Sequence, residues 1–406
     1  MTRALLVALL CAVAATPPQT LRFGRFGDVR LVRDDAEPTQ VVLLLAPDAG
    51  ALAQDLAARG ALVIAIDPTP YLKALSGGSD GCAYPAGELE GLSQFVQKTL
   101  ARRTYSVPFL IGVGPGATLV RGAIEQAPPN TFRGALTLDF DRRLTPPLRF
   151  CAAHGSVSST MPVWRAIDGA ADRAGEARLA AAFAELVADG APPRPALADD
   201  VSDLPLVSVA PSGPPSDAVA VILSGDGGWA SLDREIGDAL ATRGIPVIGF
   251  DSLQYFWTRR TPEESAEALA RVLRHAQSAW PGRRFALIGY SRGADVLPFL
   301  ASRLPSELRE RVALVALVGP ERSAEFEFHI SDWLSSDPRP DALPIAPEVA
   351  KLAGTRVLCV YGRDESESLC RDLAPDLAVR DERPGGHHFG GDYAAIAARI
   401  AQELAR

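Results

Sequence analysis

The chain has 406 residues, 47% of them hydrophobic and 22% charged, with a formal net charge of -8 at pH 7. This length and composition predict two domains, each large enough to bury its own core. The negative charge, and the lack of a basic run interleaved with aromatic residues, exclude nucleic acid as an expected partner.

The first residues are typical of a secretory signal peptide. Arg3 carries one positive charge, residues 4–15 are apolar but too few to span a bilayer, and residues 12–14 read Ala-Val-Ala, a small-residue cleavage site. An uncleaved membrane anchor is the alternative interpretation. We expect residues 1–15 to be a signal peptide and the mature protein to be exported.

The cysteine content agrees with an oxidising compartment. Beyond the predicted signal peptide the chain has four cysteines, an even number. Cys359 with Cys370, which flank a predicted loop, and Cys82 with Cys151 are the candidate disulfide pairs. Four free buried thiols are the alternative.

A β-α-β pattern in the first part of the chain returns about 180 residues later. The predicted strand, helix and strand cover residues 41–46, 52–59 and 61–66, and then residues 219–223, 232–243 and 245–250. Residues 110–117 also align with residues 287–294. Three matches in one order indicate a duplicated α/β domain.

The second of the two aligned stretches carries a Gly-x-Ser-x-Gly motif. An apolar run over residues 285–288 precedes it, and a helical pattern begins at Ala294. Ser291 is therefore expected on the tight strand-to-helix turn called a nucleophile elbow, where flanking glycines avoid crowding. In the first copy Gly114 replaces the serine, which indicates a catalytically inactive copy. A chance match in a glycine-rich chain is the alternative.

We therefore predict an α/β protein with two tandem α/β-hydrolase-like domains, each a mostly parallel sheet flanked by helices. The N-terminal domain, residues 16–196, is expected to be degenerate, and the C-terminal domain, residues 197–406, to be catalytic. The boundary is placed within residues 189–217, which are rich in Pro, Ala, Ser and Asp and have the composition of a linker.

A serine hydroxyl becomes nucleophilic when a neighbouring base removes its proton and an acid orients that base. In this fold the partners follow in the order Ser, acid, His. We assign Asp364, in the turn after the apolar run 356–361, as the acid, with Glu365 as the second choice. His387 is preferred to His388 as the base, in a glycine loop before the last predicted helix. A solvated acidic loop and a surface histidine pair are the alternatives, and neither a metal nor a cofactor is expected.

Acyl transfer also needs backbone donors for the oxyanion, one after the nucleophile and one after the first central strand. Arg292 and either Asp226 or Gly227 have these positions, although a simple tight turn has the same sequence pattern. Tyr255 and Trp257 follow a predicted strand, where ligands bind in open α/β sheets. We expect them to line an apolar pocket or a lipid-facing rim, plain loop packing being the alternative.

The C-terminal half resembles the AcvB/VirJ family of bacterial exported proteins. The motifs that carry the resemblance are Leu-Ser-Gly-Asp-Gly-Gly-Trp at residues 223–229, Asp-Ser-Leu-Gln-Tyr-Phe-Trp at 251–257, Gly-Tyr-Ser-Arg-Gly-Ala-Asp at 289–295, Phe-Glu-Phe-His at 326–329 and Gly-Gly-His-His-Phe at 385–389. The resemblance implies a periplasmic α/β-hydrolase fold and a serine esterase that removes lysine from lysyl-phosphatidylglycerol. It also implies an association with virulence and type IV secretion.

A lysyl lipid presents a cationic head group, for which carboxylates near the serine are suitable. Asp226, Asp295 and Glu365 are the candidates, because they lie near the predicted elbow, oxyanion loop and acid loop in sequence. The expected partner is thus an aminoacyl phospholipid at the membrane surface, with secretion-system proteins as a further candidate. The alternatives are a non-catalytic periplasmic adaptor and a lipase or thioesterase of other specificity.

Overall fold

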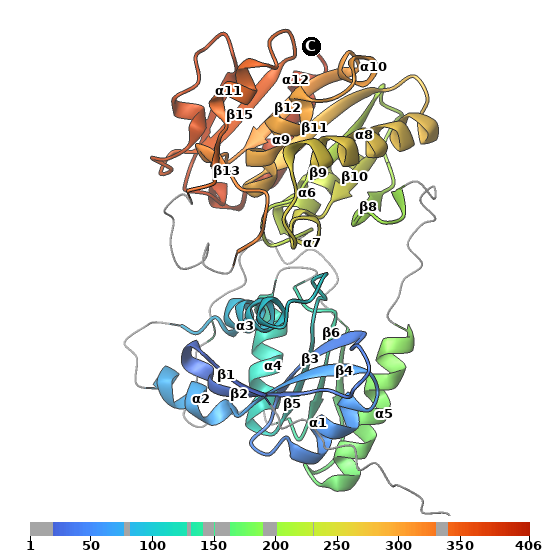
Figure 1. The fold of residues 1–406 in the computed structure, drawn as a ribbon, viewed down its shortest axis with the longest axis vertical. Helices are drawn as coiled ribbons and strands as arrows, with labels where there is room; N and C mark the ends of the chain where they lie inside the picture. Colours follow the sequence, from blue (N-terminus) through green and yellow to red (C-terminus); the bar gives the residue numbers. More distant parts are fainter. Residues whose placement is uncertain are drawn as a thin grey trace, which may run out of the picture.

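The structure is a computed structural model that describes residues 19–76, 82–127, 131–140, 150, 163–189, 201–229, 231–329 and 340–406. The predicted signal peptide and the predicted boundary at residues 196/197 lie outside these ranges. We refer to residues 19–189 as the N-terminal half and to residues 201–406 as the C-terminal half (Figure 1).

The N-terminal half contains one seven-stranded sheet in the order β1-β2-β4-β3-β5-β6-β7. The pairs β1–β2 and β2–β4 are antiparallel, and the remaining pairs are parallel. The strands are β1 (Gln19–Phe23), β2 (Gly27–Val32), β3 (Gln40–Leu45), β4 (Ala61–Ile66), β5 (Phe109–Val113), β6 (Gly134–Leu138) and β7 (Trp164–Ile167). The helices are α1 (Gly50–Ala57), α2 (Pro68–Ser76), α3 (Pro85–Thr99), α4 (Pro115–Gln126) and α5 (Arg173–Asp189).

The C-terminal half contains a second seven-stranded sheet in the order β8-β10-β9-β11-β12-β15-β16, in which only β8 is antiparallel to its neighbour. The strands are β8 (Leu206–Val209), β9 (Ala218–Leu223), β10 (Val247–Phe250), β11 (Arg284–Tyr290), β12 (Val312–Val318), β15 (Val357–Gly362) and β16 (Val379–Arg383). The larger helices are α6 (Ser231–Ala241), α8 (Pro262–Ala279), α9 (Arg292–Ser302) and α12 (Tyr393–Leu404). The shorter elements are α7 (Ser252–Tyr255), α10 (Ser306–Arg309), α11 (Ala346–Ala350) and the ribbon of β13 (Ser323–Ala324) with β14 (Leu343–Pro344).

The two sheets repeat one strand order, which confirms the predicted tandem α/β-hydrolase-like fold. From β2 to β7, the N-terminal sheet is arranged as the C-terminal sheet is from β8 to β15. The central strands form because their apolar runs are buried on both faces, as in other parallel sheets. In the C-terminal half, α8 and α9 cover one face of the sheet, and α6 and α12 cover the other.

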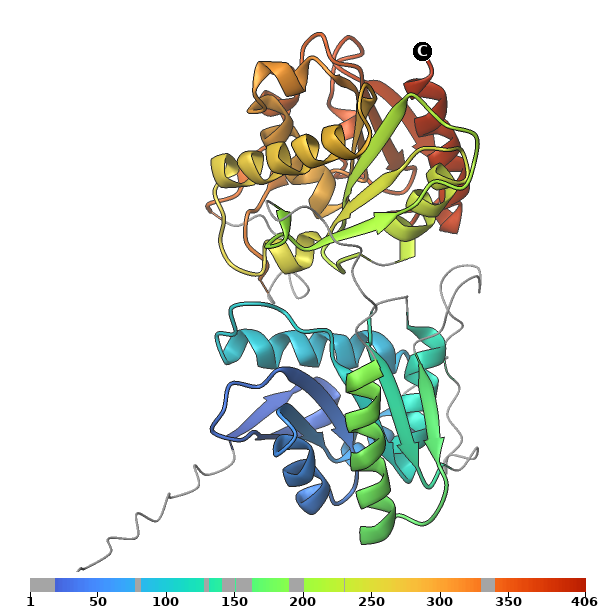
Figure 2. The same ribbon diagram turned by 90° about the vertical axis from the view of Figure 1, so that its right-hand side faces the viewer.

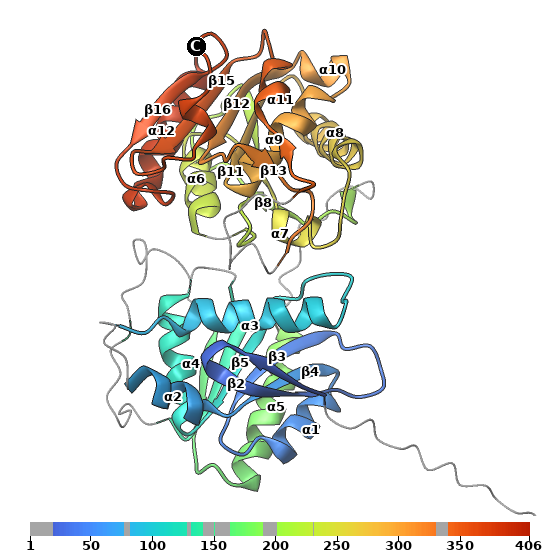
Figure 3. The same cartoon turned by 60° about the vertical axis from the view of Figure 1, so that its left-hand side comes forward.

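The carboxyl ends of the C-terminal strands point toward the N-terminal half. Helix α7 follows β10 at this edge and lies on the side of the C-terminal half that faces α3 (Figures 2 and 3). The two halves also share an apolar cluster, to which Tyr105 contributes from one side and Trp257 from the other. Because catalytic groups of this fold lie at the carboxyl ends of strands, the candidate site is near the N-terminal half.

Candidate active site

Ser291 occupies the turn between β11 and α9 in a strained conformation, with φ 50° and ψ -123°. A positive φ is rare for a residue other than glycine and is frequent at functional sites. The flanking glycines are sterically required, since a Cβ on Gly289 would lie 2.3 Å from the Gly293 carbonyl oxygen, and one on Gly293 would lie 2.1 Å from the Leu223 carbonyl oxygen. The structure thus has the geometry of a nucleophile elbow at Ser291.

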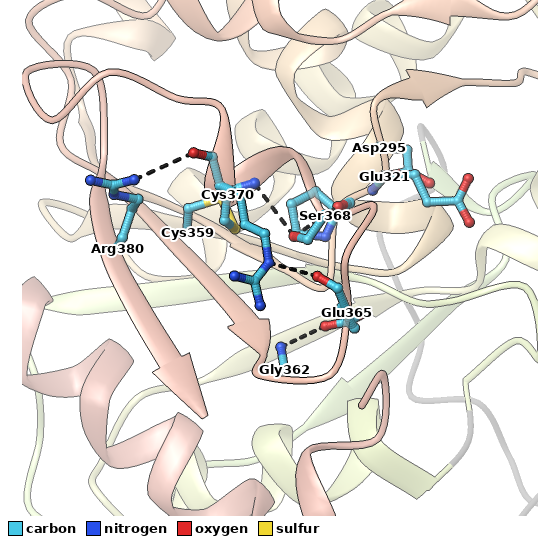
Figure 4. Close-up of a disulfide and its surroundings, with 10 residues drawn as sticks. Asp295, Glu321, Cys359, Gly362, Glu365, Ser368, Cys370 and Arg380 are labelled. Carbon is cyan, nitrogen blue, oxygen red and sulfur yellow. Dashed lines mark hydrogen bonds between the residues drawn. A yellow bond between two sulfur atoms is a disulfide. The ribbon is translucent and has the colours of Figure 1, made fainter. Parts of the chain in front are cut away.

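The loops that follow β15 and β16 meet at a histidine and a carboxylate. His387 Nδ1 donates a hydrogen bond of 2.6 Å to Glu365 Oε1. The other carboxylate oxygen, Oε2, accepts a 2.6 Å hydrogen bond from the Gly362 N–H at the end of β15 (Figure 4). With Nδ1 donating to Glu365, the Nε2 atom of His387 is the ring nitrogen left to accept a proton.

The pKa values of the pair favour a carboxylate beside an imidazole that takes up protons readily. Burial by itself lowers the pKa of His387, but the hydrogen bond and the charge of Glu365, with smaller contributions from Asp226 and Glu321, raise it above its ordinary value. Burial by itself raises the pKa of Glu365, but the hydrogen bond from His387 and the Gly362 N–H lower it below its ordinary value. Glu365 is therefore charged when His387 binds a proton.

The assignment of the acid to Asp364 needs correction. Asp364 is exposed, and its backbone N–H donates to the Gly385 carbonyl oxygen at 3.0 Å. The turn directs the side chain of the next residue, Glu365, toward His387. The geometry also distinguishes the two histidines as candidate bases. His388 is exposed, and its Nδ1 lies 3.2 Å from the Tyr290 hydroxyl, whereas the His387 Nδ1 bonds to Glu365.

Ser291 and His387 each border one of two consecutive residues at the end of β12. The Ser291 N–H donates to the Val318 carbonyl oxygen at 2.9 Å, and a Cβ on the next residue, Gly319, would lie 3.0 Å from His387 Cε1. Within the described parts of the chain, no hydrogen bond joins the Ser291 hydroxyl to the His387 ring. In structures without substrate such bonds are often long, and they tighten when substrate binds.

The loop after β9, predicted to supply an oxyanion donor, lies against the elbow. A Cβ on Gly225 would lie 3.5 Å from Ser291 Cβ, and the Gly228 N–H closes the turn on the Gly225 carbonyl oxygen at 3.2 Å. Asp226 and Gly227 are the two residues at the tip of this turn, half-buried and exposed respectively. They follow Gly225, which lies against Ser291, and this is the position expected for an oxyanion loop. Arg292 is the first residue of α9.

Three residues predicted to bind substrate have other positions. Asp295 is buried on α9 and accepts a 2.7 Å hydrogen bond from the Glu321 N–H (Figure 4), and burial raises its pKa well above the ordinary range. It is thus buried and hydrogen-bonded within the domain rather than exposed to a cationic substrate. Tyr255 packs in the core against Phe250 and Phe256, and Trp257 is only 1% exposed in the contact between the halves. Plain packing, the alternative given for these aromatic residues, is what the structure shows.

Sequence reasoning missed Glu321, whose charge helps to raise the pKa of His387. It comes three residues after the end of β12, the strand next to the elbow strand. Because carboxyl ends of adjacent parallel strands meet at one edge, its position after this strand was the available signal. Glu365, the candidate that pairs with His387, is likewise committed to that hydrogen bond rather than to a substrate.

A disulfide between Cys359 on β15 and Cys370 in the short helix Leu369–Arg371 closes the loop that carries Glu365 (Figure 4). This pair agrees with the first candidate pairing. Cys82 is disulfide-bonded as well, and its candidate partner, Cys151, lies outside the described residues.

A cavity of about 160 Å³ lies beside the segment that follows β13, and Ser291 is not among its lining residues. No group of His, Cys, Asp and Glu side chains suited to a metal ion occurs in the described residues. The same residues include no helix that is both long and apolar enough to cross a membrane.

The sheet topology and the serine elbow define the C-terminal half as an α/β-hydrolase-like domain. Residues 217–406 match the family model described as "Bacterial virulence protein (VirJ)". No curated protein matches the sequence.

Solved structures with a similar fold include Est1E from Butyrivibrio proteoclasticus, with 14% identity over 50% of this chain and 94% of that chain and a TM-score of 0.37. An alpha-beta serine hydrolase homologue from Coxiella burnetii has 17% identity over 49% of this chain and 90% of that chain, with a TM-score of 0.36. The esterase Pf2001 from Pyrococcus furiosus has 15% identity over 47% of this chain and 81% of that chain, with a TM-score of 0.35.

Proposed function

We propose that this protein is a periplasmic serine esterase that hydrolyses the aminoacyl ester of a phospholipid, as a lysyl-phosphatidylglycerol hydrolase does. The observation that carries the proposal is the 2.6 Å hydrogen bond between His387 and Glu365, next to a serine in the elbow conformation. The resemblance to exported VirJ-type proteins and the cysteine pairing support the location and the substrate class.

In the proposed reaction, His387 Nε2 removes the proton of the Ser291 hydroxyl, and the serine oxygen attacks the ester carbonyl carbon. The backbone N–H groups of Arg292 and of Asp226 or Gly227 stabilise the resulting oxyanion. His387 then donates its proton to the departing glycerol oxygen, which leaves as the free alcohol of the phospholipid. Water, deprotonated by the same histidine, cleaves the acyl-serine ester and releases the amino acid.

Negative charge around the site supports a cationic acyl group. Asp226 and Glu321 both raise the pKa of His387, so their carboxylates contribute a negative electrostatic potential at the ring. A negative potential in a cleft favours a cationic substrate and disfavours an anionic one. An esterified lysine, with two amino groups, fits this potential better than a fatty acyl chain does.

The test compares the mature protein with its Ser291→Ala variant. We expect a fluorophosphonate probe to label the mature protein at Ser291, and we expect the variant to release amino acids from aminoacyl lipids at least about a thousandfold more slowly. Unchanged circular dichroism would show that the variant is folded. Equal turnover by both proteins would contradict an esterase, and a phenotype that survives Ser291→Ala would favour the adaptor.

A further inference from the structure

The N-terminal half contacts the C-terminal half through an apolar cluster. Tyr105, from the segment after α3, packs with Leu253, Trp257 and Phe328, all of which are at most 6% exposed. The Trp257 ring stacks on Phe328 at 5.5 Å and lies 5.1 Å from Tyr105. The Trp257 Nε1–H donates to the Arg102 carbonyl oxygen at 2.8 Å, so the contact has a directional bond as well as apolar packing.

Lys98, at the end of α3, is the charged residue of this contact. Its ammonium group donates to the Trp257 carbonyl oxygen and lies 3.6 Å from the Glu327 carboxylate. It also lies over the rings of Trp257 and Phe328, at 4.8 and 5.9 Å from their centroids. The side chain is 19% exposed, and a partly desolvated ion pair with several partners restricts a loop more than an exposed pair does.

The segment that Lys98 contacts also binds the side chain of Arg292, the first residue of α9. The Arg292 guanidinium donates to the carbonyl oxygens of Glu325 and Glu327, each at 3.2 Å. The Phe328 N–H donates to the Phe256 carbonyl oxygen at 2.7 Å, which ties the same segment to the end of α7. Lys98 and Arg292 thus both bind residues 325–328, and Arg292 directly follows the serine.

A second group on α3 shows how near this helix comes to the oxyanion loop. Burial, with a smaller contribution from the charge of Asp226 in the C-terminal half, raises the pKa of Glu90 to about 8. The charge of Asp226, in the loop after β9, thus acts on Glu90 of α3. The direct contact of α3 is with residues 325–328, through Lys98.

We propose that the degenerate N-terminal half positions the oxyanion donors of the C-terminal half, and that Lys98 is the positioning residue. Lys98 restrains residues 325–328 through its ion pair with Glu327. These residues accept hydrogen bonds from the Arg292 side chain, and we infer that this keeps the Arg292 backbone N–H directed toward the oxyanion. This inference rests on the esterase function proposed above. It gives the inactive copy a role that requires neither a nucleophile nor a substrate.

The experiment uses the full mature chain and a small neutral ester, 4-nitrophenyl acetate, which does not depend on recognition of a lipid. Lys98→Met removes the charge and keeps most of the aliphatic stem. We expect it to lower kcat about tenfold with KM changed less than about twofold, because an oxyanion donor acts on the transition state rather than on the bound ester. Lys98→Arg should restore most of the loss, and hydrogen exchange of the amides in residues 323–329 should accelerate in Lys98→Met only.

Lys73→Met is the matched control, because Lys73 is an exposed lysine on α2 of the same half. Charge reversal adds a second test: Lys98→Glu should lose activity, and the combination with Glu327→Lys should recover part of it. Wild-type kcat and wild-type exchange in Lys98→Met, or an equal loss in Lys73→Met, would overturn the inference. If Ser291→Ala is inactive while Lys98→Met is not impaired, only this inference fails; if Ser291→Ala retains turnover, the proposed function fails and the positioning role fails with it.

Discussion

Glu365 makes two hydrogen bonds that fix its orientation, one to the ring of His387 and one to the Gly362 N–H. The sequence predicts an acid in this turn, because Asp364 and Glu365 both follow an apolar run that is typical of a buried strand. The sequence does not predict which of the two acids faces the histidine, because that depends on how the backbone of the turn closes. The Glu365 N–H bonds to the Gly362 carbonyl oxygen, and this closure directs Glu365 inward and Asp364 to solvent.

The first prediction at this scale compares the two acids. Glu365→Gln should lower kcat roughly a thousandfold, because the imidazole loses the group that orients it and stabilises its protonated form. Asp364→Asn should change kcat less than about twofold, as an exposed substitution usually does. Ester hydrolysis by the purified variants measures both, and a greater loss in Asp364→Asn would restore Asp364 as the acid.

The pH dependence of kcat/KM provides a second prediction. His387 acts as a base only when it is neutral, so activity is lost as the pH falls through its pKa. Because the pKa of His387 is raised, the midpoint of this loss should lie above the ordinary histidine value of about 6.5. In Glu365→Gln the residual activity should have its midpoint at lower pH, since the charge that raised the pKa is gone. An unshifted midpoint would contradict the pairing.

At the scale of elements, the strands and helices that form the site were largely predictable, whereas the surroundings of individual side chains were not. Apolar runs and glycines located the elbow, because a Cβ at either flanking glycine clashes with backbone. Tyr255 and Trp257 were placed correctly at the carboxyl edge, yet both are buried. The burial of Trp257 depends on Tyr105, which is 152 positions away along the chain and belongs to the other half. A local sequence pattern cannot predict a contact between residues that are so far apart along the chain.

The disulfide beside the acid loop leads to a prediction about one element. Replacing Cys359 and Cys370 together by Ala should lower the free energy of unfolding of the site by about 3 kcal/mol, the value expected when a loop of this size is no longer closed. The measurement is the urea concentration at which Ser291 loses its reactivity toward a fluorophosphonate. Substitution is preferable to reduction, because a reductant would also act on the disulfide of Cys82. An unchanged midpoint would show that other contacts hold the loop.

At the scale of the whole molecule, the two halves differ in what surrounds a shared elbow. Gly114 has φ 56° and ψ -121°, close to the angles of Ser291, and Gly112 and Gly116 are as confined as their counterparts. The loop with His387 follows β16, and the described part of the N-terminal sheet ends at β7 without a counterpart of that strand. In the residues that the structure describes, the duplicate thus keeps the turn but lacks the strand that leads to the histidine loop.

This difference predicts that a hydroxyl alone does not revive the N-terminal half. The variant Gly114→Ser, made in a Ser291→Ala background, should show no ester hydrolysis above Ser291→Ala, because the described part of the N-terminal half brings no histidine and acid pair to residue 114. Fluorophosphonate labelling followed by peptide mass analysis tests the outcome. A labelled peptide containing residue 114 would mean that the degenerate copy retains a base.

The order of the two halves along the chain has a consequence for biosynthesis. Domains generally fold as units, and those nearer the N-terminus fold first. The surface formed by α3 and Tyr105 is therefore expected to be complete before residues 252–329 leave the ribosome. The C-terminal half then folds in contact with this surface. In a circular permutant that exchanges the order of the halves, the surface would not yet be folded when residues 252–329 are synthesised.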